Sequence, residues 1–315
     1  MVIGGNKLFT HRGGNKVLGF VIKKIYICRM KTVNSLSGGK TSSYIAVHYP
    51  ADYNVFSLVR TDDKSCMFPD AKIRQIVSDK IGVEFIGTLE MDEIIYTMLD
   101  LEQFIGSQIT WLSPMSFDDL VYGKNKRGGV NMPSQRQRNC TFSLKVRPIE
   151  QFWFENINEP VEMRIGFRAN EMARASRMTE KTNKNGFTES KIIVGNKNGR
   201  NIWKNLEWRK PSFPLIKDAI FKDSIEEFWK DKPVRFAYKN NCVGCFERNP
   251  IFLKHMSNLC PNKFDWFNEV EKKSLAYKKM TWKEGITYER IKNYKTQLRL
   301  FDDDFGDCDS GYCGL

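Results

Sequence analysis

A glycine pair beside a lysine is the first feature of this 315-residue sequence whose residue types could do chemistry. Gly38, Gly39 and Lys40 lie in the stretch VNSLSGGKTSS, between a strand-like run and a helix-like run. Glycines let the backbone approach phosphate oxygens, and the N-terminus of the following helix offers free N–H groups and partial positive charge. The neighbouring hydroxyl groups belong to Ser37, Thr41 and Ser42. The pattern predicts a phosphate-binding loop, and the alternative is an ordinary turn between strand and helix.

The loop does not follow the Walker A pattern of many nucleotide-binding proteins. That pattern needs a glycine five residues before Gly39, and Asn34 stands there instead. The loop is also shorter than a Walker A loop. We therefore expect a phosphate site that differs from that of the standard P-loop NTPases.

The eight cysteines are the second chemical feature. The sequence has no evident signal peptide, so reduced thiols are expected rather than a disulfide framework. Cys242 and Cys245 form a Cys-x-x-Cys pair, which is half of a metal site. The four thiols that together could bind a [4Fe–4S] cluster or zinc are Cys140, Cys242, Cys245 and Cys260. A zinc site in which His255 replaces Cys140, and a buried Cys-x-x-Cys turn without a metal, remain open.

Charged residues with suitable spacing occur at two further places. Arg168 and Arg174 bracket Glu171, and their guanidinium groups are suited to hold a phosphate or sulfate in a bidentate manner. Lys145 follows Cys140 by five residues, so it could neutralise phosphate charge or lower the pKa of the thiol. A surface ion-pair cluster is the alternative for the arginines.

The elements that must position these residues alternate between strand and helix patterns. Strands are predicted over 33–36, 54–59, 83–88 and 163–167, and helices over 41–48, 70–81 and 92–105. This alternation predicts an α/β fold with a doubly wound parallel sheet. Such sheets bind ligands at the carboxyl ends of their strands, where the glycine loop and Arg168 lie. A long polar loop is expected over 107–139.

Composition divides the chain into three predicted parts. Residues 1–29 contain GGNK twice and are expected to form a flexible leader outside the fold. Residues 30–230 are the predicted nucleotide-binding domain. Residues 231–315 are expected to form a smaller helical region that contains cysteines and ends in a tail.

The net charge of +13 predicts a polyanionic partner, either nucleic acid or nucleotide phosphates. A solubilising surface is the alternative. Much of the positive charge lies in residues 177–210, which favours a nucleic-acid acceptor. No run of about 18 apolar residues occurs, so neither a transmembrane helix nor a membrane partner is expected.

The glycine loop and four further segments, in the same order, resemble one known family. SGGKTS at 37–42 is similar to the PP-loop of the N-type ATP pyrophosphatases and the phosphoadenosine-phosphosulfate (PAPS) reductases, also called adenine nucleotide alpha hydrolases. The other similar segments are RNCT at 138–141 with LK at 144–145 and Pro148, IGFRANE at 165–171 with Arg174, FPLI at 213–216, and NCVGCF at 241–246. The resemblance covers roughly residues 30–245 and is nearest to small phage or bacterial PAPS reductase-like proteins.

The resemblance implies an adenine nucleotide, ATP or PAPS, as the substrate. The residues implied to bind it are Ser37, Gly38, Gly39, Lys40, Thr41, Ser42, Asp62, Arg168, Glu171 and Arg174. Those implied in catalysis are Lys40, Cys140, Lys145, Arg168 and Cys313. Asp62 would meet the ribose or base, and Thr41 and Asp63 would help to hold Mg²⁺ between phosphate oxygens.

The C-terminal tail resembles the family in part. CGL at 313–315 is similar to the core of the ECGLH tail whose cysteine attacks the sulfonucleotide in the reductases. Tyr312 replaces the acidic residue and no histidine follows, whereas Cys308 could act as a resolving thiol. Relatives that carry an iron–sulfur cluster usually have adjacent cysteines, but Asn139 stands beside Cys140.

Three functions follow from the resemblance. The first is cleavage of ATP at its α-phosphate with release of pyrophosphate, coupled to sulfur transfer or nucleic-acid modification. The second is PAPS reduction with Cys313 as the nucleophile, and the third is nucleotide or nucleic-acid binding without catalysis. The double glycine favours ATP, because pyrophosphate carries more charge than a phosphosulfate. The implied setting is a bacterial cytoplasm, or that of a host if the gene is phage-borne, with nucleic acid or a thioredoxin-like sulfur carrier as partner.

Overall fold

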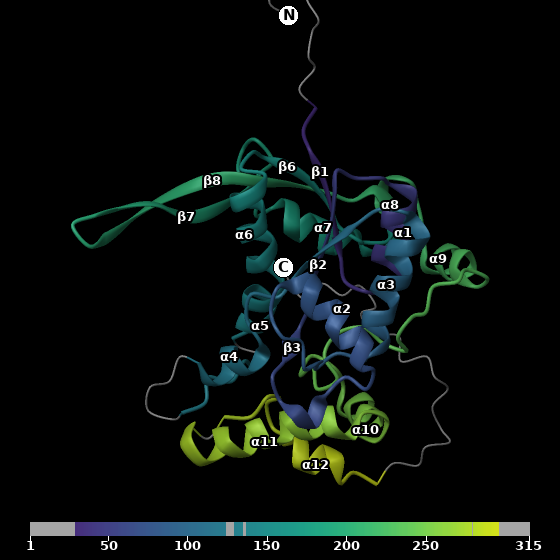
Figure 1. The fold of residues 1–315 in the computed structure, drawn as a ribbon, viewed down its shortest axis with the longest axis vertical. Coiled ribbons are helices and arrows are strands. Elements are labelled where there is room, and N and C mark those ends of the chain that lie inside the picture. Colours follow the sequence, from purple (N-terminus) through teal and green to yellow (C-terminus); the bar gives the residue numbers. More distant parts are fainter. Residues whose placement is uncertain (1–28, 124–128, 135–136, 279, 296–315) are drawn as a thin grey trace, which may run out of the picture.

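The computed structural model describes residues 29–123, 129–134, 137–278 and 280–295 (Figure 1). The predicted leader lies outside these residues except for its last one, Arg29. The tail that holds Cys308 and Cys313 also lies outside them. The structure therefore bears on the glycine loop, the arginine cluster and five of the eight cysteines.

A six-stranded sheet forms the centre of the fold. In spatial order its strands are β5 (Ile109–Leu112), β2 (Tyr53–Ser57), β1 (Thr32–Leu36), β6 (Val161–Arg164), β8 (Arg200–Ser212) and β7 (Thr188–Lys197). The first five run parallel to their neighbours, and β7 pairs antiparallel with β8. The predicted α/β fold is confirmed, and the sheet differs from the predicted parallel sheet in its antiparallel edge strand β7.

Helices cover both faces of the sheet. Val33 and Val55 face one apolar cluster, whereas Leu36 and Phe56 on the same strands face another, because side chains alternate along a strand. The first cluster includes residues of α6 (Arg147–Asn156) and α7 (Met172–Thr179). The second includes residues of α1 (Lys40–His48), α2 (Ala71–Ile81), α3 (Glu93–Ile105) and α9 (Lys222–Trp229).

The remaining elements are mostly short. They are η1 (Lys64–Cys66), α4 (Phe117–Tyr122), α5 (Asn139–Thr141), the π-helical turn η2 (Phe142–Val146), η3 (Ala169–Glu171), α8 (Pro214–Lys217), α10 (Pro250–Leu259), α11 (Pro261–Lys278) and α12 (Tyr288–Lys292). The predicted helices over 41–48, 70–81 and 92–105 correspond to α1, α2 and α3.

The strand predicted over residues 83–88 is largely wrong. Only Gly87–Thr88 (β4) is extended, and it pairs antiparallel with β3 (Arg60–Thr61) in a separate two-stranded ribbon. A Cβ atom at Gly87 would lie 2.0 Å from the backbone oxygen of Cys66, so this glycine permits a close chain crossing. The apolar side chain of Phe85 is buried by packing rather than by pairing in the main sheet.

The polar loop predicted over residues 107–139 is interrupted by two elements. The apolar residues of β5 add an edge strand to the sheet. Helix α4 begins with a capping box, in which the Ser116 hydroxyl accepts from the Asp119 N–H and the Asp119 carboxylate accepts from the Ser116 N–H. The short length of both elements hid them among the surrounding polar residues.

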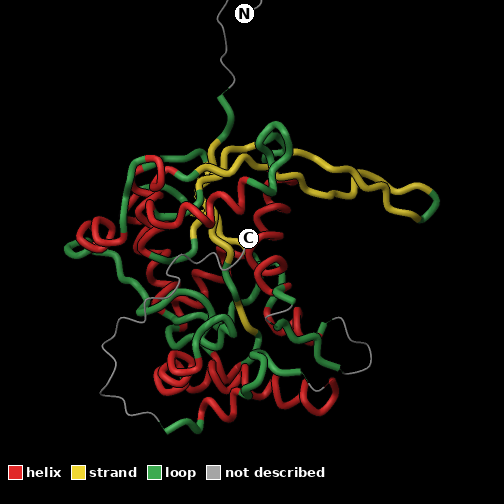
Figure 2. The backbone as a smooth tube through the Cα atoms, turned by 180° about the vertical axis from the view of Figure 1, so that it is seen from behind, coloured by secondary structure: helices red, strands yellow, loops and turns green. Residues whose placement is uncertain are grey.

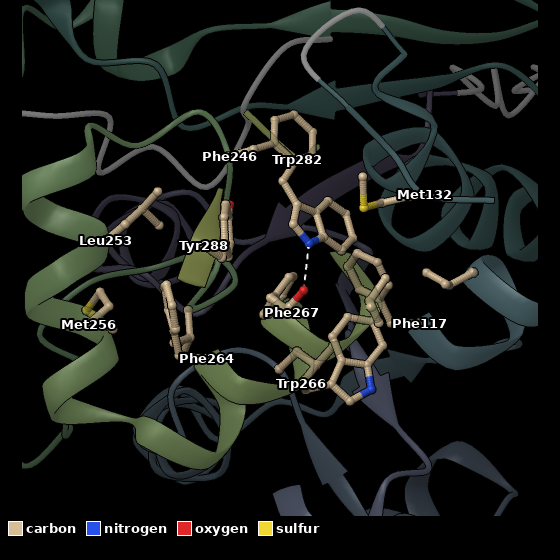
Figure 3. Packing of buried hydrophobic residues seen from close by; sticks show 14 of the residues in the cluster. Phe117, Met132, Phe246, Leu253, Met256, Phe264, Trp266, Phe267, Trp282 and Tyr288 are labelled. Atoms are coloured by element: carbon tan, nitrogen blue, oxygen red, sulfur yellow. Dashed lines mark hydrogen bonds between the residues drawn. The ribbon is translucent and has the colours of Figure 1, made fainter. Parts of the chain in front are cut away.

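The C-terminal helices pack on the rest of the chain through an aromatic cluster (Figure 3). Trp282 and Phe267 lie with Phe117 of α4, and the ring centroids of Phe117 and Phe267 are 5.8 Å apart. The same cluster contains Val59 and Leu144, which come from the body of the sheet domain. One apolar core therefore spans both sides of the boundary expected near residue 230.

Candidate nucleotide-phosphate site

The predicted glycine loop joins β1 to α1, at the carboxyl end of the central strand. Gly38 has a φ of +75°, and a Cβ there would lie 2.5 Å from the Cγ2 atom of Ile94. Gly39 is the N-cap of α1, and a Cβ there would lie 1.9 Å from the Nδ2 atom of Asn240. Gly38 is favoured by its backbone conformation and by the nearby Ile94, and a side chain at Gly39 would have to displace the Asn240 side chain.

The N-terminus of α1 carries no side-chain cap. Gly39 supplies none, and the first turn contains no acidic residue. A helix start of this kind presents N–H groups and partial positive charge to an anion. Gly166 supports the arrangement, because a Cβ there would lie 3.3 Å from Thr41, so the end of β6 lies close against the start of α1.

The serines of the loop stabilise the loop itself. The Ser37 N–H donates to the Ser42 hydroxyl over 3.1 Å, and the Ser42 hydroxyl donates to the Gly39 carbonyl over 3.1 Å. The two hydroxyl oxygens are also 3.1 Å apart. Thr41 instead lines the neighbouring cavity. The structure thus brings all six predicted loop residues together, and the Ser42 hydroxyl makes its hydrogen bonds within the loop.

A cavity of about 350 Å³ lies beside the start of α1, within the size range of small-ligand sites. The predicted residues Lys40, Thr41 and Arg168 line it. Lys222 and Lys239 add two more cations to the same lining, against the carboxylates of Asp223 and Glu226. The cavity is therefore lined by four basic and two acidic side chains, which suits an anionic ligand.

Helix α9 holds one wall of this cavity against α1. The Lys40 ammonium forms an ion pair with Glu226 of α9. The Trp229 indole N–H donates to the backbone oxygen of Lys40 over 3.0 Å. The Lys40 ammonium also lies 6.0 Å from the centre of the Phe236 ring. These contacts fix the first residue of α1 from a segment almost 190 residues further along the chain.

The arginine cluster follows β6, on the strand next to β1. The Glu171 carboxylate accepts from the backbone N–H of Arg168 over 2.9 Å, from its Nε over 3.1 Å, and from Arg174. Burial alone would raise the pKa of Glu171, but the hydrogen bonds and charges of Arg168 and Arg174 hold it below its ordinary value. The Arg174 guanidinium lies 4.5 Å from the centre of the Phe167 ring. Glu171 therefore orients two arginines, of which Arg168 reaches the cavity.

The carboxylates that follow β2 have local partners. Asp62 forms an ion pair with Arg60, and its backbone N–H donates to Asp118 over 2.8 Å. Asp63 caps η1, where it accepts from the Ser65 N–H over 2.8 Å. Neither is among the described residues that line the cavity at Lys40. The structure therefore does not bring Asp62 or Asp63 to that cavity.

Three of the predicted thiols lie together beside Lys145. Cys140, Cys242 and Cys245 line a small cavity of about 40 Å³ with that lysine. The Lys145 ammonium is 2.9 Å from the carboxylate of Glu90, which is 2% exposed. Lys145 also lines an adjoining small cavity with Ser37 of the glycine loop. The lysine thus links the loop and the thiols in space.

Two of these thiols, Cys140 and Cys242, have raised pKa values. Burial raises the pKa of Cys140, and the positive charge of Lys145 opposes the rise without cancelling it. Burial, reinforced by the charge of Glu90, raises the pKa of Cys242 well above its ordinary value. The predicted lowering of the Cys140 pKa by Lys145 is therefore outweighed by burial of the thiol itself.

Cys260 does not join these thiols. It ends α10, where burial raises its pKa and the nearby charges are those of Lys263, Glu93 and Asp92. Within the described ranges, no three His, Cys, Asp or Glu side chains are grouped so that they could hold a metal ion. Cys140, Cys242, Cys245 and Cys260 therefore do not form one four-thiolate site among the described residues. The expected Mg²⁺ ion, which Thr41 and Asp63 would hold between phosphate oxygens, stays a prediction.

Spacing along the chain gave no indication of Lys222, Lys239 or Asn240. These three residues come from the segment that follows β8, where the sequence pattern indicated a role only for the cysteines. Lys239 and Asn240 are each 9% exposed although both are polar. A run of polar residues directly before a motif is the one signal that could have pointed to them.

No known protein family, curated protein or solved structure matches this chain. The class that the fold itself defines is an α/β protein with a mostly parallel six-stranded sheet flanked by helices. Among the described residues, no helix is both long enough and apolar enough to cross a membrane.

Proposed function

We propose that the chain is an enzyme of the adenine nucleotide alpha hydrolase type that binds ATP and cleaves it at the α-phosphate, releasing pyrophosphate. The glycine loop carries this proposal. Gly38 and Gly39 leave no room for side chains at an uncapped helix N-terminus, and the adjoining cavity is lined by Lys40 and Arg168. Backbone N–H groups and cations in this arrangement suit the highly charged pyrophosphate group.

The proposed chemistry uses the chain's own groups. An oxygen nucleophile, from the acceptor or from water, attacks the α-phosphorus while the bond to the oxygen that bridges the α- and β-phosphates breaks. That oxygen leaves with the electron pair as part of pyrophosphate. The N–H groups of α1, Lys40 and Arg168 stabilise the negative charge that develops on it. The products are pyrophosphate and an adenylated acceptor, or AMP when water is the acceptor.

The thiols beside the loop support sulfur transfer as the following stage. Cys140, Cys242 and Cys245 lie next to Lys145, which also lines a cavity with Ser37. In that stage a persulfide, received by one of these thiols from an external persulfide donor, attacks the carbon that carries the adenylate, and AMP leaves with the oxygen and its electron pair. Attack of a second thiol on the sulfur of the first then releases the transferred sulfur on the acceptor and leaves a disulfide, which an external thiol reductant reduces. The raised pKa values of Cys140 and Cys242 mean that these two thiols need further activation before they react.

The test offers ATP and PAPS side by side to the full chain, purified without oxygen and analysed for iron, zinc and sulfide. Release of pyrophosphate from ATP is the expected result. Release of sulfite from PAPS would overturn the choice of ATP in favour of a reductase. Binding of either nucleotide without turnover would overturn the enzymatic proposal.

Two variants tie the expected activity to the site. Lys40→Gln and Arg168→Gln should each slow pyrophosphate release by about a hundredfold, the loss typical when one charge-stabilising donor is removed. Lys72→Gln removes an exposed charge on α2 and serves as the control with unchanged activity. Equal rates in all three variants would show that the activity arises elsewhere.

A further inference from the structure

Strands β7 and β8 form a long two-stranded arm that leaves the body of the protein, as Figures 1 and 2 show from opposite sides. Only residues 209–212 of β8 pair with β6, so the rest of β8 pairs with β7 alone. At the usual rise per residue, the unsupported part of the ribbon is roughly 30 Å long. An isolated ribbon of two strands contributes little to stability, so its length calls for another explanation.

The end of the arm is a defined two-residue turn. Asn198 and Gly199 have φ values of +52° and +77°, and Lys197 pairs with Arg200 across them. Positive φ at both central residues is the type I′ geometry, whose twist matches that of the flanking strands. The cations on either side of the turn are therefore presented in a fixed arrangement.

The outer part of the arm is strongly basic. Residues 191–205 contain four basic side chains, those of Lys191, Lys197, Arg200 and Lys204, and no acidic one. All four are exposed, and no ion pair joins any of them to a described carboxylate. Lys197 and Arg200 are directly opposite each other, which is a destabilising arrangement for like charges. An anionic partner would relieve this repulsion.

The acidic residues at the base of the arm do not neutralise it. Glu189 accepts hydrogen bonds from the side-chain amides of Asn183 and Asn205, and Glu207 accepts from Asn183 and Asn185. Both carboxylates are thus hydrogen-bonded to asparagine side chains. The charge of the outer ribbon faces solvent.

The arm also carries groups that suit the interior of a nucleic-acid groove. Trp203 is 52% exposed and lies opposite Ile193, and the Lys191 ammonium is 5.6 Å from the centre of the indole ring. Asn196 and Asn201 are paired across the ribbon and exposed. Asparagine can read base edges, and apolar side chains can contact thymine methyl groups.

We propose that the β7–β8 arm binds duplex DNA by lying in its major groove, with Lys197 and Arg200 on the phosphates. The major groove of B-form DNA admits a two-stranded ribbon, whereas the major groove of A-form RNA is too narrow for side chains to read. The arm is distinct from the cavity at Lys40, so this proposal does not depend on the nucleotide chemistry.

The test measures binding of the full chain to a short fluorescein-labelled duplex DNA of mixed sequence, by fluorescence anisotropy at several salt concentrations. The double variant Lys197→Gln/Arg200→Gln should bind about tenfold or more weakly and show a salt slope smaller by about two, since two phosphate contacts are lost. The control Lys72→Gln/Lys217→Gln removes the same charge from exposed positions on α2 and α8 and should bind as the parent does.

Each other outcome counts against the proposal. Equal weakening by the two double variants would assign binding to net charge rather than to the arm. Tighter binding of single-stranded DNA or of duplex RNA at the same salt would overturn the assignment to duplex DNA. ATP binding, measured on the same samples, should be unchanged in the arm variant, which shows that it remains folded and keeps the two proposals separate.

Discussion

Gly39 is the position in the glycine loop with the least space for an added side chain. A Cβ atom there would lie 1.9 Å from the Nδ2 atom of Asn240 and 2.9 Å from its Cγ atom. Gly39→Ala should therefore push Asn240 away from the loop, cost about 1–3 kcal/mol of stability as overpacking does, and weaken ATP binding. Thermal unfolding and calorimetric titration with ATP measure the two effects.

A second variant separates the steric effect of Gly39→Ala from a loss of loop flexibility. Asn240→Ala removes all three atoms that a Cβ at Gly39 would meet. In the double variant Gly39→Ala/Asn240→Ala the steric part of the stability loss should disappear. A double variant as unstable as the sum of the two single variants would show that the contact with Asn240 is not the reason for the glycine.

Glu171 should make stability depend on pH in acid. Its pKa in the folded protein is below the ordinary value of 4.5, so it contributes stability above about pH 4.5. That contribution is lost as the pH falls through the folded-state pKa. Glu171→Gln should cost about 2 kcal/mol near neutral pH, because charge-assisted hydrogen bonds to Arg168 and Arg174 are weakened.

Urea unfolding of both proteins over a pH series measures this effect. The stability gap between the parent and Glu171→Gln should be constant at neutral pH and should close as the pH falls below about 4.5. A gap that is the same at low and neutral pH would mean that the carboxylate charge does not stabilise the arginine cluster.

At the scale of elements, α9 would compete for Lys40 with the ATP of the proposed function. The Glu226 carboxylate offsets part of the charge of the Lys40 ammonium, and the side chains of this ion pair are 37% and 41% exposed. Glu226→Gln should therefore tighten ATP binding, by at most about fivefold, since ion pairs this exposed contribute about 1 kcal/mol or less. Glu227→Gln is the matched control, because that residue lies on the same helix and is 75% exposed. Weaker binding by Glu226→Gln alone would show that Glu226 assists the ligand instead.

The elements also mark the limit of pattern-based prediction. Helices α2 and α3 follow clear periodicity, and α2 has local signals at both ends: the Asp70 side chain caps its start, and Gly82 ends it with a φ of +73°. The segment 83–88 also has a strand-like pattern, but it lies outside the main sheet. Propensity describes the segment alone, whereas pairing depends on which edge of the sheet is free.

At the scale of the whole molecule, Trp282 couples the C-terminal helices to the sheet domain. It is fully buried in the aromatic cluster, and its indole N–H donates to the Phe267 carbonyl over 2.8 Å. Trp282→Ala should lower the free energy of unfolding by about 3–5 kcal/mol, as expected for a large buried aromatic residue. Trp203→Ala on the exposed arm should change it by about 0.5 kcal/mol or less.

Unfolding should remain a single transition in the parent protein, because the cluster contains residues from both sides of the boundary expected near residue 230. Circular dichroism and tryptophan fluorescence should therefore report coincident midpoints. Two separate transitions would show that the C-terminal helices form an independent unit.

The sequence by itself determined the local features of this protein. These features are the glycine loop between a strand and a helix, the alternation that predicts a parallel sheet, and the basic residues of the arm. Each can be predicted from the sequence because it depends on residues that are close together along the chain. Only the tertiary structure decided which distant residues meet. It brought Asn240 and Lys239 to the glycine loop, gathered three thiols beside Lys145 and left Cys260 elsewhere. The physical reason is that such contacts are set by how helices and strands pack, and packing depends on the shape of the whole core rather than on spacing in the sequence.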